Sequence, residues 1–426
     1  MSSPESSTAV AWYRQLNKTQ WYTLLGAWMG WSLDGFDFVL ITYVLSNIAD
    51  EFHLSLAVTG TLVLAAFATR WLGAAILGSM SDRSGRKGAM IWGVVLYSVA
   101  TFACGLAWSY WSLFAFRLLV GIGMAGEYSA GTTLLLESWP RHLRNKASGF
   151  IVSGWAMGGM LGSSAYAAIV PNWGWRALFF IGIAPAFLTL FIRYFLPESH
   201  EWTEARAEAK KEGRTAGISF FQLFSRRWLP VTATLFIVQF SGFGMTWPIT
   251  SLMPTYLRSI QYNPIGIGQM MFIANLGALF GYWFGGFLAD RIGTARAIIW
   301  TILVSTIFLF AAFMVRDSFA ILAIIMFLLQ FTRQGVAGLY PKYTTDFFDV
   351  DVRASGLGIT YNLGSIAGGL SPVWGGALTT VIGLGPAILV CSLFWSIVIL
   401  AMLIFNVPKR VADRTTRRMD ATIAHA

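Results

Sequence analysis

The stretch GSMSDRSGRK (residues 78–87) follows a long apolar run, and a related stretch, GFLADRIGTAR (286–296), follows another apolar run in the second half of the chain. Both stretches place a glycine four residues before Asp-Arg and a second glycine two residues after it. Gly158 recurs as Gly368 at nearly the same spacing. Matches at one common offset indicate that a unit of about 210 residues has been duplicated in parallel.

The composition defines the class of protein. Of 426 residues, 56% are hydrophobic and 12% are charged, with a mean hydropathy of +0.61, whereas soluble domains carry about 25% charge. We predict an all-α polytopic membrane protein with twelve transmembrane helices in two pseudo-symmetric six-helix bundles. The apolar runs, each able to cross a bilayer with about 20 residues, lie near 21–47, 57–80, 88–108, 110–137, 146–170, 174–196, 228–257, 264–289, 294–315, 318–345, 354–380 and 383–407.

The positive charges predict the topology. Most of the 30 lysines and arginines fall in the two tails, the even-numbered loops and the central linker, so the positive-inside rule places both termini in the cytoplasm. The net charge of +10 is therefore a topology signal, and no nucleic-acid partner is expected. The first 20 residues lack the apolar core of a signal peptide. We divide the chain into an N-terminal cytoplasmic segment (1–20), an N-terminal bundle (21–196), a cytoplasmic linker (197–227), a C-terminal bundle (228–407) and a cytoplasmic tail (408–426).

The repeated loop motif resembles the signature of the major facilitator superfamily, which implies the major facilitator fold. Asp82, near a helix end, can pair with arginines of the neighbouring bundle and hold the cytoplasmic face shut until the bundles move apart. The alternative is that the charges of this motif only anchor a loop. The predicted gate motif comprises Gly78, Asp82, Arg83, Gly85, Arg86, Asp290 and Arg291.

Charged residues inside the apolar runs are candidates for proton coupling, because each is costly in a bilayer. Asp34 and Asp37 share one face of the first predicted helix, and the equivalent stretch of the second half has no acid. We predict a switchable ion pair between Asp37 and Arg117, with Asp34 and Glu127 as further proton-coupling residues. The alternatives are a static bridge for the pair and packing for Glu127. No histidine lies in a predicted span, and we expect no metal and no cofactor.

Arginines in the apolar runs are candidate anchors for an anionic substrate, because a guanidinium holds a carboxylate through two parallel hydrogen bonds. Arg70 aligns with Ala278 in the second half, so it is not required by the repeated fold. We predict that Arg70 and Arg333 bind substrate; the alternative is pairing with the intramembrane acids. The second half also supplies neutral polar and aromatic candidates for substrate binding: Gln239, Trp247, Asn275, Gln330, Gln334, Tyr361 and Asn362.

Several stretches resemble one family within the superfamily. LDGFDFVLI (33–41), GMAGEYSAG (123–131), ESWPRHLRNKASGF (137–150) and YNLGSIAGGLSP (361–372) are similar to the sialate–proton symporters of bacterial inner membranes. The resemblance implies a transporter, not an enzyme, that imports sialic acid or a close derivative with protons by alternating access. We expect a monomer. The alternative is a proton symporter of another organic monocarboxylate such as lactate.

Overall fold

The regular structure of the chain is helical throughout the described residues. The computed structural model describes residues 12–84, 86–140, 143–183, 187, 223–225, 227–315, 318–348 and 350–424. Most of the predicted linker 197–227 lies outside these ranges and stays a prediction. By length and composition, seven of the described helices are able to cross a membrane on their own.

The N-terminal half begins at a capping box, in which the Asn17 side chain accepts from Gln20 N and the Gln20 side chain accepts from Asn17 N. The predicted fifth and sixth spans are continuous in α6 and are separated by a kink at Gly174, whose φ of 72° suits a residue without a Cβ. The elements of this half are η1 (Trp12–Gln15), α1 (Lys18–Tyr43), α2 (Leu45–Phe52), α3 (Leu56–Ser84), α4 (Arg86–Gly105), α5 (Tyr110–Ser138) and α6 (Arg144–Ile181).

The C-terminal half repeats this plan with two interruptions. The predicted tenth span is divided into α12 and α13, and the predicted eleventh span into α14 and α15. The predicted tail forms a helix, α17, that packs against α9. The elements are α9 (Leu229–Ser259), α10 (Pro264–Ile292), α11 (Thr294–Met314), α12 (Phe319–Ala337), α13 (Tyr340–Thr345), α14 (Val350–Gly364), α15 (Ile366–Ile382), α16 (Leu384–Ile404) and α17 (Val407–Ala424).

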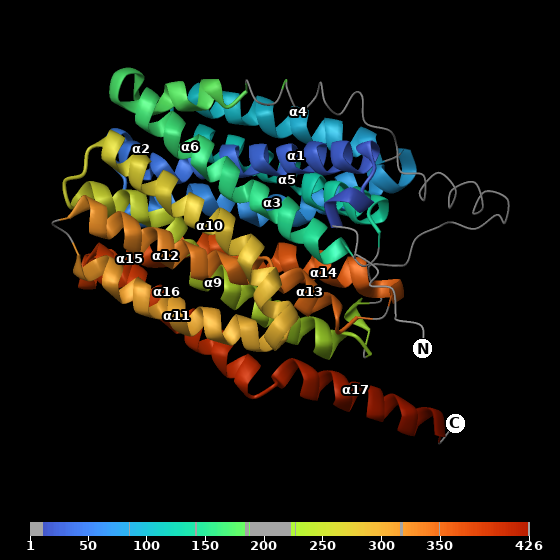
Figure 1. Cartoon of the computed structure of the whole chain (residues 1–426). Coiled ribbons are helices and arrows are strands. Elements are labelled where there is room, and N and C mark those ends of the chain that lie inside the picture. Colours follow the sequence, from blue (N-terminus) through green and yellow to red (C-terminus); the bar gives the residue numbers. More distant parts are fainter. Residues whose placement is uncertain are drawn as a thin grey trace, which may run out of the picture.

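The two halves form two layers of roughly parallel helices, with α1 to α6 in one and α9 to α16 in the other (Figure 1). The layers meet mainly where α3 packs against α15 and where α6 packs against α10. Because the repeat relates α3 to α10 and α6 to α14 and α15, these two seams are equivalent. The arrangement confirms the predicted all-α fold of two bundles.

Equivalent glycines close both seams at one end of the molecule. A Cβ on Gly60 of α3 would lie 2.8 Å from the carbonyl carbon of Pro372 in α15. A Cβ on Gly268 of α10 would lie 2.7 Å from the carbonyl oxygen of Ser163 in α6. Gly60 and Gly268 occupy corresponding positions of the duplicated unit, so the absent side chains let each pair of helices approach at the same level.

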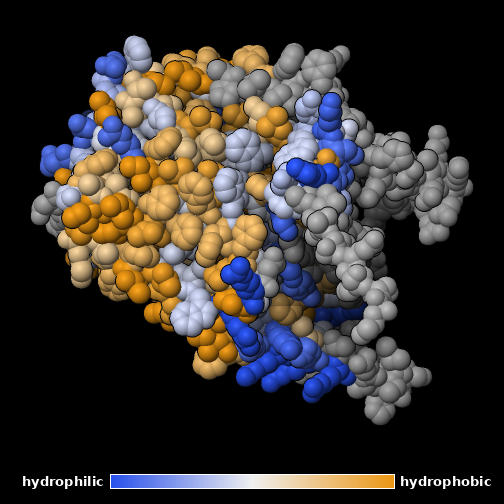
Figure 2. All heavy atoms as spheres, in the orientation of Figure 1, coloured by the Kyte–Doolittle hydropathy of each residue, from blue (hydrophilic) through white to orange (hydrophobic). Residues whose placement is uncertain are grey.

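This closed end lies opposite the end at which α1 begins and α17 extends (Figure 1). We call the two ends the closed end and the terminal end. Between them, apolar side chains cover the surface, and hydrophilic residues gather toward the two ends (Figure 2). The large exposed side chains of this belt include Phe287, Trp300, Ile307, Phe394 and Ile397, a distribution that suits contact with lipid hydrocarbon.

Candidate functional site: a cavity between the bundles

A cavity lies between the bundles near the middle of α1, α3 and α9. Its empty volume is about 740 Å³, including the space at its mouth. Both halves contribute to its wall: Trp31, Arg70, Val152, Trp155, Gln239, Gly242, Phe243, Thr246, Trp247, Thr250, Tyr282, Gln334, Ala337, Tyr340, Pro341 and Tyr361.

The N-terminal bundle supplies an aromatic wall and one arginine. The rings of Trp31 and Trp155 lie 5.3 Å apart, and Trp155 lies 6.0 Å from Trp247 of the other bundle. Arg70 is 1% exposed, and its guanidinium carbon lies 6.0 Å from the ring centroid of Tyr361. Aromatic faces next to a guanidinium suit a ligand with both an apolar face and a negative charge.

The C-terminal bundle supplies most of the neutral hydrogen-bonding groups. The Gln239 amide donates to Thr344 Oγ1 at 3.1 Å, and the Tyr282 hydroxyl donates to Gln334 Oε1 at 3.1 Å. The Gln334 amide nitrogen makes no hydrogen bond within the described part of the chain. The Tyr282 contact therefore holds this amide in place while leaving its N–H groups available to a ligand.

Asp34 lies near the arginine side of the cavity. It is fully buried, and both Asp34 and Arg70 interact electrostatically with Tyr361. The predicted substrate anchor Arg70, on α3, and the predicted proton-coupling residue Asp34, on α1, therefore both act electrostatically on one phenol.

Asp37 and Arg117 lie deeper in the N-terminal bundle, away from the cavity wall. The two side chains interact electrostatically, but no nitrogen–oxygen distance between them falls within 4.0 Å. Arg117 Nε donates to Leu62 O at 3.3 Å, while Nη1 and Nη2 have no hydrogen-bond partner in the described residues. A Cβ on Gly182 would lie 3.1 Å from Asp37 Oδ1. The predicted partners are thus neighbours, but they do not form a salt bridge in this structure.

Phe38 connects this buried charge pair to the cavity. Its ring lies 5.4 Å from the guanidinium carbon of Arg117. The same ring lies 4.6 Å from Phe67 and 5.1 Å from Trp247, which lines the cavity. One aromatic side chain therefore contacts both the guanidinium of Arg117 and the cavity wall.

Other predicted substrate-binding residues lie outside the cavity wall. Arg333 is buried inside the C-terminal bundle, and Asn275 donates to Met271 O at 2.8 Å at the α6–α10 seam. Asn362 donates to Gly358 O at 2.9 Å within α14, and Gln330 is buried with its Oε1 unpaired in the described structure. Of the nine predicted binding residues, the cavity brings together Arg70, Gln239, Trp247, Gln334 and Tyr361.

The side chains of Glu127 and of most of the gate motif lie outside the described residues. This applies to Gly78, Asp82, Arg83, Gly85, Arg86 and Asp290. Arg291 is described and is exposed near the end of α10. The predicted latch at the terminal end therefore stays a prediction.

Several cavity residues were not predicted from the sequence, among them Trp31, Trp155, Tyr282 and Tyr340. Each lies in a predicted apolar span, where an aromatic residue is more often packed in the core or against lipid than placed at a binding site. A signal in the sequence was available only for residues whose charge or amide is costly in a membrane.

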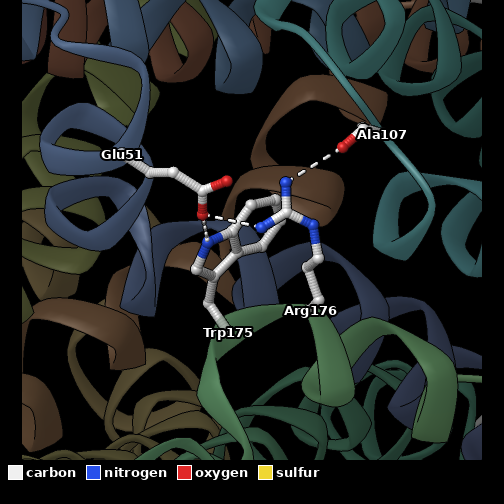
Figure 3. Close-up of polar contacts among 4 residues, drawn as sticks. All are labelled: Glu51, Ala107, Trp175 and Arg176. Carbon is white, nitrogen blue, oxygen red and sulfur yellow. Dashed lines mark hydrogen bonds and ion pairs between the residues drawn. The ribbon is translucent and has the colours of Figure 1, made fainter.

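The closed end carries a second polar cluster, built on the short helix α2 (Figure 3). Glu51 accepts from Arg176 Nη1 and from Trp175 Nε1, both at 2.7 Å, and Arg176 Nη2 donates to Ala107 O at 3.1 Å. The hydrogen bond from Arg176 lowers the pKa of Glu51 below its ordinary value of 4.5. These contacts tie α2 to the N-terminal bundle.

The neighbouring acid on α2 faces the other bundle. Arg258 of α9 donates to Asp50 Oδ2 at 2.9 Å and to Ser46 Oγ at 2.8 Å. Consecutive acids of one helix therefore bind opposite halves of the molecule, and α2 joins the two bundles at the closed end.

Two repeat-related helical bundles around a central cavity, closed at one end, are the architecture of membrane transporters that work by alternating access. A family model described as the Major Facilitator Superfamily matches residues 27–372 and 235–422. The chain belongs to this superfamily.

Individual relatives refine the comparison. The chain is 36% identical over 405 residues to the sialic acid transporter NanX of Escherichia coli K12, covering 95% of this chain and 98% of that protein. It is 27% identical to a probable 4-methylmuconolactone transporter of Cupriavidus pinatubonensis, covering 96% of each. A partially occluded, inward-open structure of the xylose transporter XylE from E. coli superposes with a TM-score of 0.74 at 18% identity, covering 91% and 98% of the two chains. The first relative confirms the resemblance to sialate–proton symporters, and the structure supports the fold.

Proposed function

We propose that this protein imports sialic acid, or a close derivative, together with protons across the bacterial inner membrane by alternating access. The observation that carries the proposal is the position of Arg70, a buried guanidinium in the wall of a cavity between the two bundles. The nearly full-length similarity to a sialic acid transporter supports the choice of substrate.

The chemistry of the cavity suits a sugar acid. A carboxylate would bind Arg70, because a guanidinium matches two carboxylate oxygens. The Gln334 amide, held by Tyr282, and the hydroxyls of Thr246 and Thr250 would bind hydroxyl and N-acyl groups. The aromatic wall would cover the apolar face of the sugar ring.

Proton coupling is assigned to the buried acids. Asp37, close to Arg117 but not paired with it, would exchange a proton as the bundles move, and Phe38 would pass the change to the cavity wall. Asp34 would respond to the substrate, because it interacts electrostatically with Tyr361, which lines the cavity. Glu127 is retained as a further candidate on the sequence argument alone. A titratable group that changes charge during the cycle links proton flow to transport.

The orientation and state follow from the same proposal. With both termini in the cytoplasm, the closed end faces the periplasm, and the ion pair of Arg258 with Asp50 joins the two bundles on that side. The described structure then corresponds to a state that exchanges substrate with the cytoplasm. We propose a monomer as the transporting unit.

The test is uptake of labelled N-acetylneuraminate into proteoliposomes under an imposed pH gradient. We expect accumulation by the wild type, and equilibration without accumulation by Asp37→Asn. Asp346→Asn is the matched control, because Asp346 pairs with Lys342 on an exposed helix face and should transport normally. Uptake of lactate but not of N-acetylneuraminate would replace the substrate while keeping the transporter class. Full accumulation by Asp37→Asn would remove Asp37 from the coupling mechanism.

A further inference from the structure

Arg333 is a buried cation whose described neighbours are all neutral. It is 0% exposed, and its Nη2 donates to Met245 O and to Ser396 Oγ, both at 3.0 Å. Its Nη1 donates to Ser305 Oγ at 3.4 Å, and its Nε has no hydrogen-bond partner in the described chain. Fully buried charges are normally paired. The C-terminal bundle therefore holds a positive charge without a counter-charge among the described residues.

Tyr340 links the charge of Arg333 to the cavity wall. It is the first residue of α13, seven residues after Arg333, interacts electrostatically with Arg333, and lines the cavity. A Cβ on Gly242 would lie 2.9 Å from Tyr340 Oη, and Met245, which accepts from Arg333, lies one turn further along α9. One turn of α9 therefore contacts both side chains. Tyr340 Oη is buried and makes no hydrogen bond within the described residues, so its proton is available to a ligand.

The charge balance across the cavity is uneven. In the N-terminal bundle, the acid Asp34 and the cation Arg70 both interact electrostatically with Tyr361. In the C-terminal bundle, no described acid offsets Arg333. A bound monoanion would supply the missing negative charge.

We propose that Arg333 selects the anionic form of the substrate through Tyr340, whose hydroxyl donates a hydrogen bond to the bound anion. Arg333 is a positioning residue in this arrangement: it does not line the cavity, and its charge strengthens Tyr340 as a donor. The inference rests on the proposed function, because it assigns a specificity role within the same cavity. Arg70 remains the direct partner of the carboxylate.

The experiment compares an acid with its neutral ester in the purified full-length protein. Binding of N-acetylneuraminate and of its methyl ester is followed by the fluorescence of the cavity tryptophans. The variants are Arg333→Gln, Tyr340→Phe and the double variant. We expect each single variant to weaken binding of the acid by on the order of tenfold, as for a hydrogen bond to a charged group, and to leave binding of the ester unchanged. The double variant should lose no more than either single variant, because the two residues act as one unit.

Other results would overturn the inference. Equal losses for acid and ester would indicate a purely structural role, and additive losses would show that Arg333 acts independently of Tyr340. If Arg333→Gln does not fold, Tyr340→Phe decides alone, and an unchanged preference for the acid refutes the proposal. If the wild type binds lactate but not N-acetylneuraminate, the proposed substrate is wrong, and the same comparison with lactate and methyl lactate still tests Arg333.

Discussion

Replacing Gly60 by alanine should shift the equilibrium between the two states of the transporter. The added Cβ would lie 2.8 Å from the carbonyl carbon of Pro372 and 3.0 Å from Val373 N. Both atoms belong to the backbone of α15, so no side-chain rotation relieves the overlap. Restoring an ordinary contact requires a separation of at least 3.4 Å, and α15 must therefore move away from α3.

The expected magnitude follows from the cost of overpacking. An extra methyl group against rigid neighbours costs about 1–3 kcal/mol, which corresponds to a shift of about 5- to 150-fold between two states. The penalty falls only on the state in which the bundles meet at this end of the molecule, because α3 and α15 separate when the bundles move apart there. Gly268→Ala should act in the same direction, because it overlaps with α6 at the equivalent position of the other seam.

The assay measures the separation of the bundles at the closed end by double electron–electron resonance. Spin labels are attached to cysteines that replace Trp108 and Met314, which are 76% and 80% exposed, after removal of the buried cysteines Cys104 and Cys391. We expect Gly60→Ala to increase the population of long distances.

Two controls separate the mechanism from general destabilisation. A Cβ on Gly281 would lie 2.1 Å from Phe331 O inside the C-terminal bundle, so Gly281→Ala should lower the melting temperature without changing the distances. A Cβ on Gly286 meets nothing within 4 Å, so Gly286→Ala should change neither quantity. The reasoning is refuted if Gly60→Ala lowers the melting temperature and leaves the distance distribution like that of the wild type.

Two further predictions concern the cluster on α2. Asp50→Asn removes the charge opposite Arg258 but leaves the Ser46 hydrogen bond. Because the paired side chains are 40% and 67% exposed, the equilibrium between the two states, measured by the same resonance experiment, should shift by at most about 1 kcal/mol. A shift larger than that of Gly60→Ala would contradict this. The lowered pKa of Glu51 means that its stabilising contribution is complete above its unfolded-state pKa of about 4.5 and is lost as the pH falls through the lower folded-state pKa. The melting temperatures of wild type and Glu51→Gln should therefore differ by a constant small amount at neutral pH and converge on acidification, and divergence would disprove the assignment.

The candidate site was only partly predictable. Arg70 was found because a guanidinium in a membrane span is costly and because its repeat-related position holds Ala278. The same reasoning selected Arg333, which lies behind the cavity wall rather than in it. Charge identifies a residue as unusual, but its distance from the cavity depends on how the helices of its bundle pack.

Aromatic residues show the opposite case. Trp155 and Trp31 form much of the N-terminal wall, yet nothing in the local sequence separates them from Trp300, which is 60% exposed on the outer surface. A tryptophan in an apolar helix is compatible with lipid, core and ligand alike. Only the rotation of each helix within its bundle decides among these environments.

The sequence by itself determined the class of fold, the number of bundles and the duplication, because hydropathy, positive charge and repeated motifs are properties of the chain read in order. It also placed Asp37 and Arg117 among the charged residues inside the membrane. The tertiary structure decided that these two are neighbours with an open ion pair, that Gly60 and Gly268 close two equivalent seams, and that Tyr340 lies between Arg333 and the cavity. Each of these facts depends on distances of a few ångströms between helices far apart in the sequence, and such distances are set by side-chain packing across the whole molecule.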